Sequence, residues 1–225
     1  MLALIYDVHG NLPALEAVLA DAVPAGAERY LLGGDYALFG AWPAETVERL
    51  RGLDARWIRG NVDRWTAQPD DAPDEVRPAI DACRELLDPA TVAELAALDE
   101  EAVVDGVRYC HASPRSDVDS FAPDDPGRDE ELLAGASEAR VVFGHTHIQF
   151  ARRSPAGPEL VNPGSVGIPL DGDRRAAYAL VDAGGDLDLR RVEYDWRASA
   201  AAIRERLGEA AEVAARRIEL ARFEL

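Results

Sequence analysis

The sequence predicts an α/β fold built on mixed sheets, and repeated units near the N-terminus are the first indication. The apolar run at residues 2–6 has the length of a strand and leads, through a short turn, into an amphipathic stretch at 13–19. The run at 29–32 ends at two glycines and precedes a helical segment at about 44–53. Strands that alternate with helical segments are typical of parallel βα units.

The second half of the chain predicts antiparallel strands. The runs at 101–105 and 107–110 meet at Asp105-Gly106, which is a strong hairpin signal. Four more short strands are expected at 149–153, 159–161, 176–181 and 187–192. Because the connections between these four strands are too short for a parallel crossover, we expect them to be mostly antiparallel.

Two regions favour helices. In residues 64–99, apolar residues recur at helical spacing and prolines cluster near the beginning, which indicates a loop-plus-helix insertion over one edge of the site. Segments rich in Ala, Glu and Arg predict C-terminal helices over about 196–224 that pack back on the fold or join a partner chain, so a homo-oligomer is an open alternative. We find no internal repeat or separating linker and expect one domain over residues 1–225.

The charge balance excludes one class of partner. The 225 residues carry a formal net charge of −18, whereas a surface that binds nucleic-acid polymers needs clustered Lys and Arg. No apolar run approaches the roughly 20 residues of a membrane span, and the first residues lack a signal-peptide pattern. We therefore expect a cytoplasmic protein with a small substrate, no membrane partner, and free thiols at Cys83 and Cys110.

All four histidines follow predicted strands. His9 and His111 each come after an apolar run, and the run at 141–143 leads into Gly144-His145-Thr146-His147. Ligands gather beyond the carboxyl ends of strands in such sheets, so residues far apart in sequence meet there. We therefore expect these strand ends to converge on a metal site.

Asp and Asn residues end the first three strands. Asp7 precedes His9, Asp35 follows two glycines, and Asn61 follows Gly60. With the histidines they make seven nitrogen or oxygen donors without a thiolate, too many for one tetrahedral zinc and suited to two divalent ions bridged by a carboxylate. An alternative for the first turn is that Asp7 caps the helix and His9 is incidental.

Other loop residues have two interpretations each. Arg115, in a loop at 115–130 that we expect to be mobile, is a weak candidate for a phosphate contact. The turn Asn162-Pro163-Gly164-Ser165 either contacts the site or bonds only to itself. One group of loop aromatics is more typical of packing than of base stacking: Tyr36, Phe39 and Trp42.

The order of the strand-end blocks resembles a known family, the calcineurin-like metallophosphoesterases. The blocks are Asp7-Val8-His9, Gly34-Asp35, Gly60-Asn61, His111 and Gly144-His145-Thr146-His147. The resemblance spans nearly the whole chain, and the turn at 162–165 is similar to that of the bacterial branch of small phosphoesterases. It implies a four-layer αββα sandwich, with two mixed β-sheets face to face and helices outside.

The resemblance also implies roles for individual residues. One metal ion would be held by Asp7, His9, Asp35 and His147, and the other by Asp35, Asn61, His111 and His145. Asp35 would be the bridge, and it would act in catalysis with Asn61 and His111. Asp63 would orient the ligands rather than transfer a proton. We favour manganese, and iron, zinc, nickel and magnesium remain open.

One position departs from the family pattern. Many relatives carry a histidine after Gly-Asn that contacts the phosphate and protonates the leaving group, whereas this chain has Val62. The general acid is therefore missing or supplied by another residue. Some small bacterial phosphodiesterases that the chain resembles also lack this histidine, so we still expect activity.

Together these features predict a dinuclear metal-dependent phosphoesterase of small phosphorylated substrates, with phosphodiesters favoured. The alternatives are a diadenosine polyphosphate hydrolase, a phosphomonoesterase, or a non-catalytic scaffold of the same fold. A scaffold requires eroded ligands, and this chain keeps all seven. The pocket walls expected at 64–85 and 112–130 carry no motif that identifies the substrate.

Overall fold

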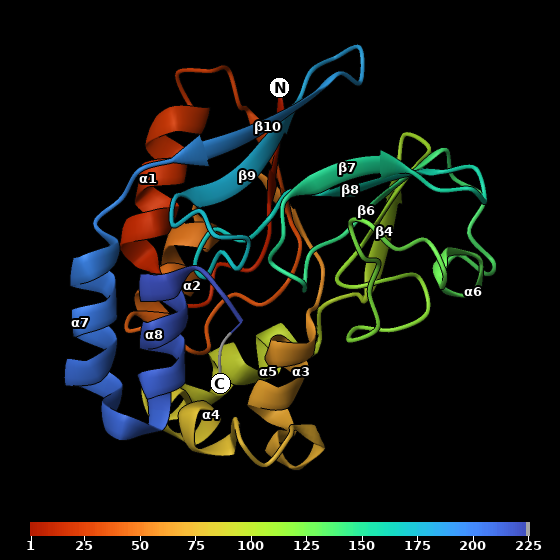
Figure 1. Ribbon diagram of the computed structural model, residues 1–225. Coiled ribbons are helices and arrows are strands. Elements are labelled where there is room, and N and C mark those ends of the chain that lie inside the picture. The colour runs from red at the N-terminus through yellow and green to blue at the C-terminus, as the bar shows by residue number, and fades with distance from the viewer. Residues whose placement is uncertain (224–225) are drawn as a thin grey trace.

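The computed structural model describes residues 1–223 and contains two five-stranded mixed sheets (Figure 1). The first sheet has the strand order β10-β9-β1-β2-β3, and the second has the order β4-β5-β6-β8-β7. The predicted α/β class with two mixed sheets is therefore confirmed.

The first sheet combines a parallel core with an antiparallel edge. Its parallel strands are β1 (Leu2–Ile5), β2 (Arg29–Leu32) and β3 (Ala55–Trp57). The helices that connect them are α1 (Leu12–Ala22) and α2 (Pro43–Arg51). The antiparallel strands are β9 (Ala176–Val181), which pairs with β1, and β10 (Leu187–Val192). Asn11 caps α1, as its side-chain oxygen accepts from the Ala14 backbone N–H.

The second sheet is built from the middle of the chain. The predicted hairpin consists of β4 (Glu101–Val104) and β5 (Val107–Cys110). Two parallel strands follow, β6 (Arg140–Val142) and β8 (Glu159–Asn162), and the antiparallel edge is β7 (Phe150–Arg153). The short helix α6 (Asp129–Leu132) lies between β5 and β6 in sequence.

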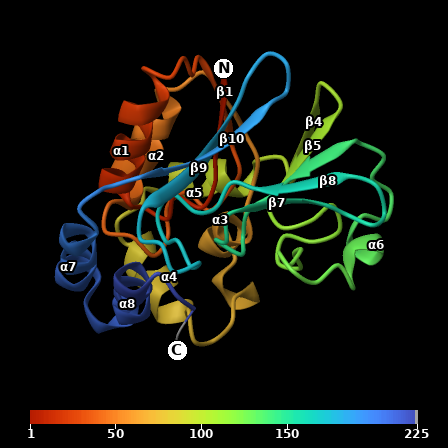
Figure 2. The ribbon, with the colours of Figure 1, turned by 45° about the horizontal axis from the view of Figure 1, so that its top comes forward.

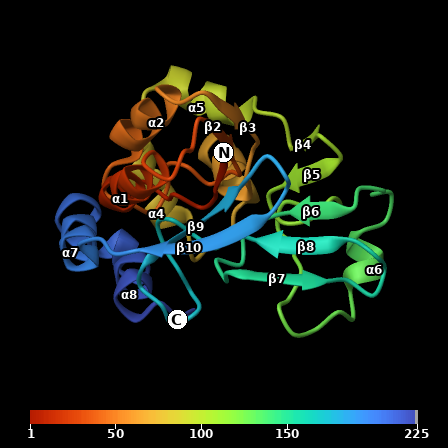
Figure 3. The same cartoon turned by 90° about the horizontal axis from the view of Figure 1, so that it is seen from above.

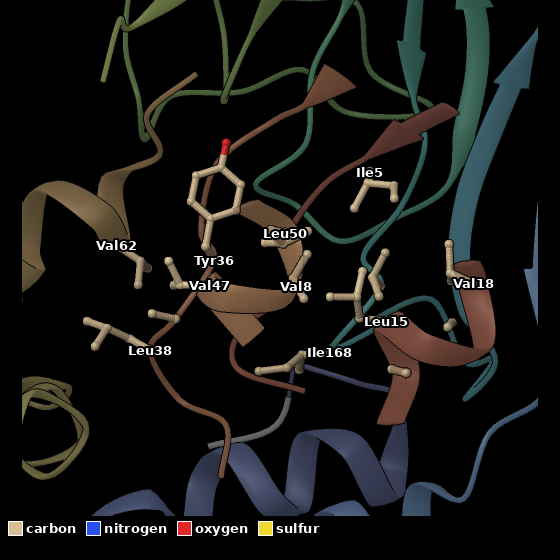
Figure 4. Packing of buried hydrophobic residues seen from close by; sticks show 14 of the residues in the cluster. Ile5, Val8, Leu15, Val18, Tyr36, Leu38, Val47, Leu50, Val62 and Ile168 are labelled. Carbon is tan, nitrogen blue, oxygen red and sulfur yellow. The ribbon is translucent and has the colours of Figure 1, made fainter. Parts of the chain in front are cut away.

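The two sheets pack face to face through side chains that alternate along each strand. Leu4 and Tyr6 belong to a buried cluster that includes Val142 of the second sheet. Ile5, one residue out of step, lies instead in the helix-side cluster with Leu15 of α1 (Figure 4). Because successive side chains of a strand point to opposite faces, the first strand supplies both contacts.

Helices and loops cover both outer faces, which completes the predicted four layers. α1 and α2 lie outside the first sheet, and α6 lies at the opposite side of the molecule (Figures 1 and 3). Leu132 of α6 and Phe121 of the preceding loop pack against Phe143 and Leu160 of the second sheet. This outer layer is thin because α6 has only four residues.

The segment after β3 is divided into short helices. They are α3 (Asn61–Ala67), a 3-10 turn η1 (Pro69–Asp71), α4 (Arg77–Arg84) and α5 (Pro89–Ala96). Helical structure thus begins at Asn61, earlier than the residue 64 expected from the sequence, so a candidate metal ligand occupies the first turn of α3. Proline near the start of an element needs no N–H partner, and three of these four segments begin that way.

Two C-terminal helices pack together near α4 (Figure 2). They are α7 (Trp196–Leu207) and α8 (Glu212–Leu220), joined by the 3-10 turn η2 (Gly208–Ala211). The second helix is shorter than predicted, because Ala221 has a left-handed backbone with φ of 50°. Its expected end at about residue 224 lies outside the described residues. Within residues 1–223, no helix has the length and apolarity that crossing a membrane requires.

We expect the core between α1 and the first sheet to dominate stability. Leu15 is fully buried, and Leu15→Ala should lower the free energy of unfolding by about 2–5 kcal/mol because it leaves a cavity. The neighbouring Glu16 forms only an exposed ion pair with Arg49, so Glu16→Ala should cost less than about 1 kcal/mol. Urea unfolding of both variants checks this, and equal losses would contradict it.

Candidate metal centre

All seven candidate donors lie at the carboxyl ends of the strands. Asp7 and His9 follow β1, Asp35 follows β2, Asn61 follows β3, His111 follows β5, and His145 and His147 follow β6. All are buried except His145, which is half-buried. Residues as far apart in sequence as Asp7 and His147, 140 positions, therefore meet in one place.

Asp7, His9 and His147 form one half of the centre. The Nε2 atoms of His9 and His147 lie 3.1 Å apart, and Nε2 of His147 lies 3.4 Å from Oδ1 of Asp7. Each of the three residues offers one donor atom, and these three atoms lie within 4.8 Å of one another. These distances allow the three side chains to share a metal ion.

The other half contains Asp35, Asn61, His111 and His145. Nε2 of His111 lies 3.3 Å from Oδ2 of Asp35. The amide of Asn61 lies 2.9 Å from Nδ1 of His145 and 2.9 Å from Nε2 of His111. The same Asp35 oxygen is 3.8 Å from Nε2 of His9, so this carboxylate lies between the halves.

Asp7 also reaches both halves. Its Oδ1 atom lies 3.9 Å from Nε2 of His9 and 3.9 Å from Nε2 of His111, and Asp7 belongs to a second compact donor group with Asp35 and His111. Two carboxylates are therefore placed between the histidines. The bridging role of Asp35 stays a prediction.

Hydrogen bonds set the direction of three imidazole rings. The Nδ1 atoms of His9, His111 and His147 face the backbone carbonyl oxygens of Leu38, Gly33 and Ile168 at 3.1, 2.8 and 2.6 Å. A carbonyl oxygen only accepts, so each Nδ1 carries a proton and each Nε2 points into the centre. This arrangement is typical of metal-binding histidines. Against the effect of burial, the Asp35 carboxylate beside Nε2 of His111 raises the pKa of that imidazole to about 10.

The centre contains electron pairs that protein groups do not satisfy. Oδ1 of Asp7 is buried and has no hydrogen-bond partner among residues 1–223, although burying an unpaired carboxylate oxygen is costly. Burial lowers the pKa of His9 and His145 to about 4, so both imidazoles are neutral at pH 7. The residues present therefore fit divalent cations, which would pair with Asp7 and with the facing nitrogens of His9 and His147.

Asp63 holds the loops that carry two donors. Its Oδ2 accepts from the backbone N–H groups of Asp35 and Gly60 at 2.8 and 2.9 Å, and its Oδ1 accepts from that of Tyr36 at 3.1 Å. Burial and the nearby Asp35 carboxylate raise the pKa of Asp63 to about 7, against the effect of these three donors. These contacts are with the backbone of the loops that carry Asp35 and Asn61, and the orienting role of Asp63 stays a prediction.

The backbone at the centre is unusual and was not foreseen. Five candidate ligands have a left-handed backbone, with φ between 49° and 66°: Asp7, His9, Asp35, His145 and His147. Residues other than glycine rarely adopt this conformation, and it clusters at functional sites. A Cβ on Gly60 would lie 2.1 Å from Oδ1 of Asp35, so glycine is needed there for close approach.

The turn at residues 162–165 supports the centre from outside. Asn162 Nδ2 donates to the carbonyl oxygen of Gly144 and to Oγ1 of Thr146, both at 3.0 Å. The Ser165 hydroxyl donates to the carbonyl oxygen of Asp7 at 2.8 Å. The turn therefore contacts the site, as the first of the two interpretations held, through two backbone carbonyl oxygens and the Thr146 hydroxyl.

A cavity of about 460 Å³ lies beside the centre. Its walls come partly from the predicted segments 64–85 and 112–130, which supply Trp65, Val76 and Val118. Arg217 and Phe223 of the C-terminal segment also line it, and no motif in the sequence indicated them. Arg115 is exposed and lines a different pocket, next to His111.

Proteins similar to this chain were found both among solved structures and among known sequences. A metallophosphoesterase from Sphaerobacter thermophilus is 27% identical, with 98% of each chain covered and a TM-score of 0.84. The hypothetical protein PH1004 from Pyrococcus horikoshii OT3 has the same fold, with 23% identity, 94% and 96% coverage and a TM-score of 0.81. The uncharacterized protein MJ0912 of Methanocaldococcus jannaschii is 29% identical over 87% of this chain and 88% of its own.

The sequence of residues 1–186 matches the calcineurin-like phosphoesterase superfamily domain. This match covers both sheets up to the β9–β10 turn and all seven donors, and it agrees with the convergence of those donors on one centre. The chain is therefore a phosphoester hydrolase that belongs to the calcineurin-like phosphoesterase superfamily.

Proposed function

We propose that this phosphoesterase uses two divalent metal ions to hydrolyse small phosphodiesters. The observation that carries the proposal is the buried, unpartnered Oδ1 of Asp7, which faces the Nε2 atoms of three histidines. Donors that point inward without protein partners favour cations at this place. A non-catalytic scaffold has no need of such a costly arrangement.

The donor geometry supports two adjacent sites. Asp7, His9, Asp35 and His147 would hold one ion, and Asp35, Asn61, His111 and His145 would hold the other. When bound, such ions lower the pKa of water and neutralise phosphate oxygens. The donors are nitrogen and oxygen atoms only, a set that accepts manganese, which we favour, as well as iron, zinc, nickel or magnesium.

The chain itself orients these groups. The backbone N–H of Val62 donates to Oδ1 of Asp35 at 2.9 Å, which leaves Oδ2 free to face the histidines. Asp63 fixes the same loop through the Asp35 N–H. Asn61 lies beside His111 and lines the cavity, where the substrate phosphate would sit.

The side chain of Val62 places an apolar group at the cavity instead of an acid. It is 2% exposed and packs with Leu38 and Val47 in the helix-side cluster (Figure 4). It lines the cavity but offers no proton to a departing oxygen. This favours substrates whose leaving groups are stable as anions, and phosphodiesters with such leaving groups are the class we propose.

Metal analysis provides the first test of the two sites. We expect two manganese ions per chain, roughly 3.5–4 Å apart, because one carboxylate must reach both. A crystal grown with manganese and measured at its absorption edge would locate them. A single ion, or an Asp35 outside both coordination shells, would contradict the assignment.

Loss of a central donor should abolish turnover without unfolding the chain. Asp35→Asn and His111→Ala are each expected to lower kcat by at least about 10³-fold, since each removes charge stabilisation of several kcal/mol from the transition state. The exposed Asp99→Asn serves as a matched control and should keep full activity. Hydrolysis of bis(p-nitrophenyl) phosphate at saturating manganese checks this, and a folded Asp35→Asn enzyme with most of its activity would refute the mechanism.

Turnover should depend strongly on the leaving group. A positioned proton donor is typically worth about 10²- to 10⁴-fold, mainly for poor leaving groups. We therefore expect log kcat/KM to fall steeply as the leaving-group pKa rises, with aryl diesters cleaved much faster than alkyl monoesters. Val62→His should flatten this slope, although its size and polarity should also destabilise the core by about 1–3 kcal/mol.

Val62→Ala is the control for this comparison, because it changes packing without adding an acid. It should keep the parent slope. A flat plot for the parent enzyme, with chemistry rate-limiting, would mean that another residue already donates the proton.

A further inference from the structure

Part of the wall of the cavity beside the metal centre comes from outside the matched family domain. Arg217 in α8 and Phe223 line it, whereas the domain match ends at residue 186. The donors His9, Asp35 and Asn61 line the same cavity. A molecule whose phosphate lies at the metal centre would therefore extend toward Arg217.

Arg217 is a half-buried cation that forms no ion pair with a carboxylate of residues 1–223. Its Nε atom is enclosed and has no hydrogen-bond partner among residues 1–223. Burial lowers the pKa of Arg217, and no carboxylate in the described part of the chain opposes this shift. Arg204 of α7 is different, because it forms ion pairs with Glu212 and Glu219 of α8.

This difference matters because the chain has 42 acidic residues and only 24 basic ones. Partners for an arginine are abundant, and α8 itself supplies two of them to Arg204. Burying part of a guanidinium without a carboxylate partner costs free energy, because the group loses contacts with water. An anion bound in the cavity would replace those contacts. The arrangement around Arg217 thus favours an anionic ligand.

Three aromatic side chains line the same cavity as Arg217: Phe39, Trp65 and Phe223. Phe39 lies beside His9, with ring centroids 5.6 Å apart, and Trp65 extends from α3 into the cavity wall. The guanidinium carbon of Arg217 lies 4.3 Å from the centroid of the Phe223 ring, which holds that ring against it. Stacking on such rings is how proteins bind bases without reading their edges.

We propose that Arg217 is a specificity-determining residue that binds a second anionic group of the substrate. The substrate is then nucleotide-like, with one phosphate at the metal centre, a planar aromatic group among Phe39, Trp65 and Phe223, and a further phosphate at Arg217. The inference rests on the proposed function only for the position of the first phosphate. Arginine suits this role because its planar fork bonds two phosphate oxygens at once.

Equilibrium binding tests the proposal without turnover. Isothermal titration calorimetry of the manganese-loaded protein would measure the affinities for AMP and for α,β-methylene-ADP. The second ligand carries one more anionic group, joined through a methylene carbon that resists hydrolysis. Arg217→Gln should lower the affinity for α,β-methylene-ADP by about 10- to 100-fold and the affinity for AMP by less than about 3-fold. Only the second anionic group loses a charge-assisted hydrogen bond. Arg217→Lys should recover part of the loss.

Arg216→Gln is the matched control, since Arg216 is the exposed neighbour on the same helix. It should change neither affinity. Arg217→Gln that weakens both ligands equally, or neither, overturns the proposal. A purely structural role for Arg217 predicts the equal loss together with a lower melting temperature, so the two roles give different results.

The binding experiment also separates this inference from the proposed function. If the parent protein hydrolyses no phosphodiester but loses its preference for α,β-methylene-ADP in Arg217→Gln, the second-anion site stands and the proposed reaction fails. If hydrolysis follows the expected pattern while Arg217→Gln keeps the ligand preference, the reaction stands and the role of Arg217 is refuted.

Discussion

The burial of two carboxylates beside three inward-facing imidazole nitrogens is the constraint on which the rest of the structure depends. Asp7 and Asp35 are 0% and 2% exposed, so the free energy lost with their hydration must be offset within the fold. One oxygen of each accepts a backbone N–H, from His145 and Val62 respectively. The other oxygen is left for a cation. Left-handed backbone at the ligands and glycine at position 60 follow from the need to bring five loops this close.

Much of the fold and centre could be predicted because the informative residues follow apolar runs. Even a strand of four residues, once it pairs in the sheet, fixes the position of its carboxyl end. A histidine or aspartate directly after the strand must then lie at that edge of the sheet. The order of the blocks then distinguishes a shared centre from isolated caps. The bonds of Asp63 could not be predicted in this detail, because they depend on how two loops meet in space.

The part of the cavity wall that Arg217 and Phe223 form could not be predicted for a different reason. An amphipathic pattern identifies α8 as a helix but does not say which structure its polar side chains face. The turn η2 and the left-handed Ala221 set the direction of the last segment. Gly208, with φ of 64°, marks the turn, but Ala221 has no such sequence signal. Phe39, interpreted from sequence as loop packing, lines the cavity while also packing beside His9.

The distribution of the donors along the chain has a consequence for how the protein folds. His9 and His147 are separated by 138 positions, and the centre needs loops from both sheets, so no fragment of the chain can form it alone. Contacts of this kind form late, since the entropy of closing long loops must be lost before they give any stabilisation. Metal that binds the folded state only would stabilise it by mass action, so apparent stability would rise with free metal concentration. In a metal-poor cell the folded population of this chain would then depend on ion supply, independently of any effect on turnover.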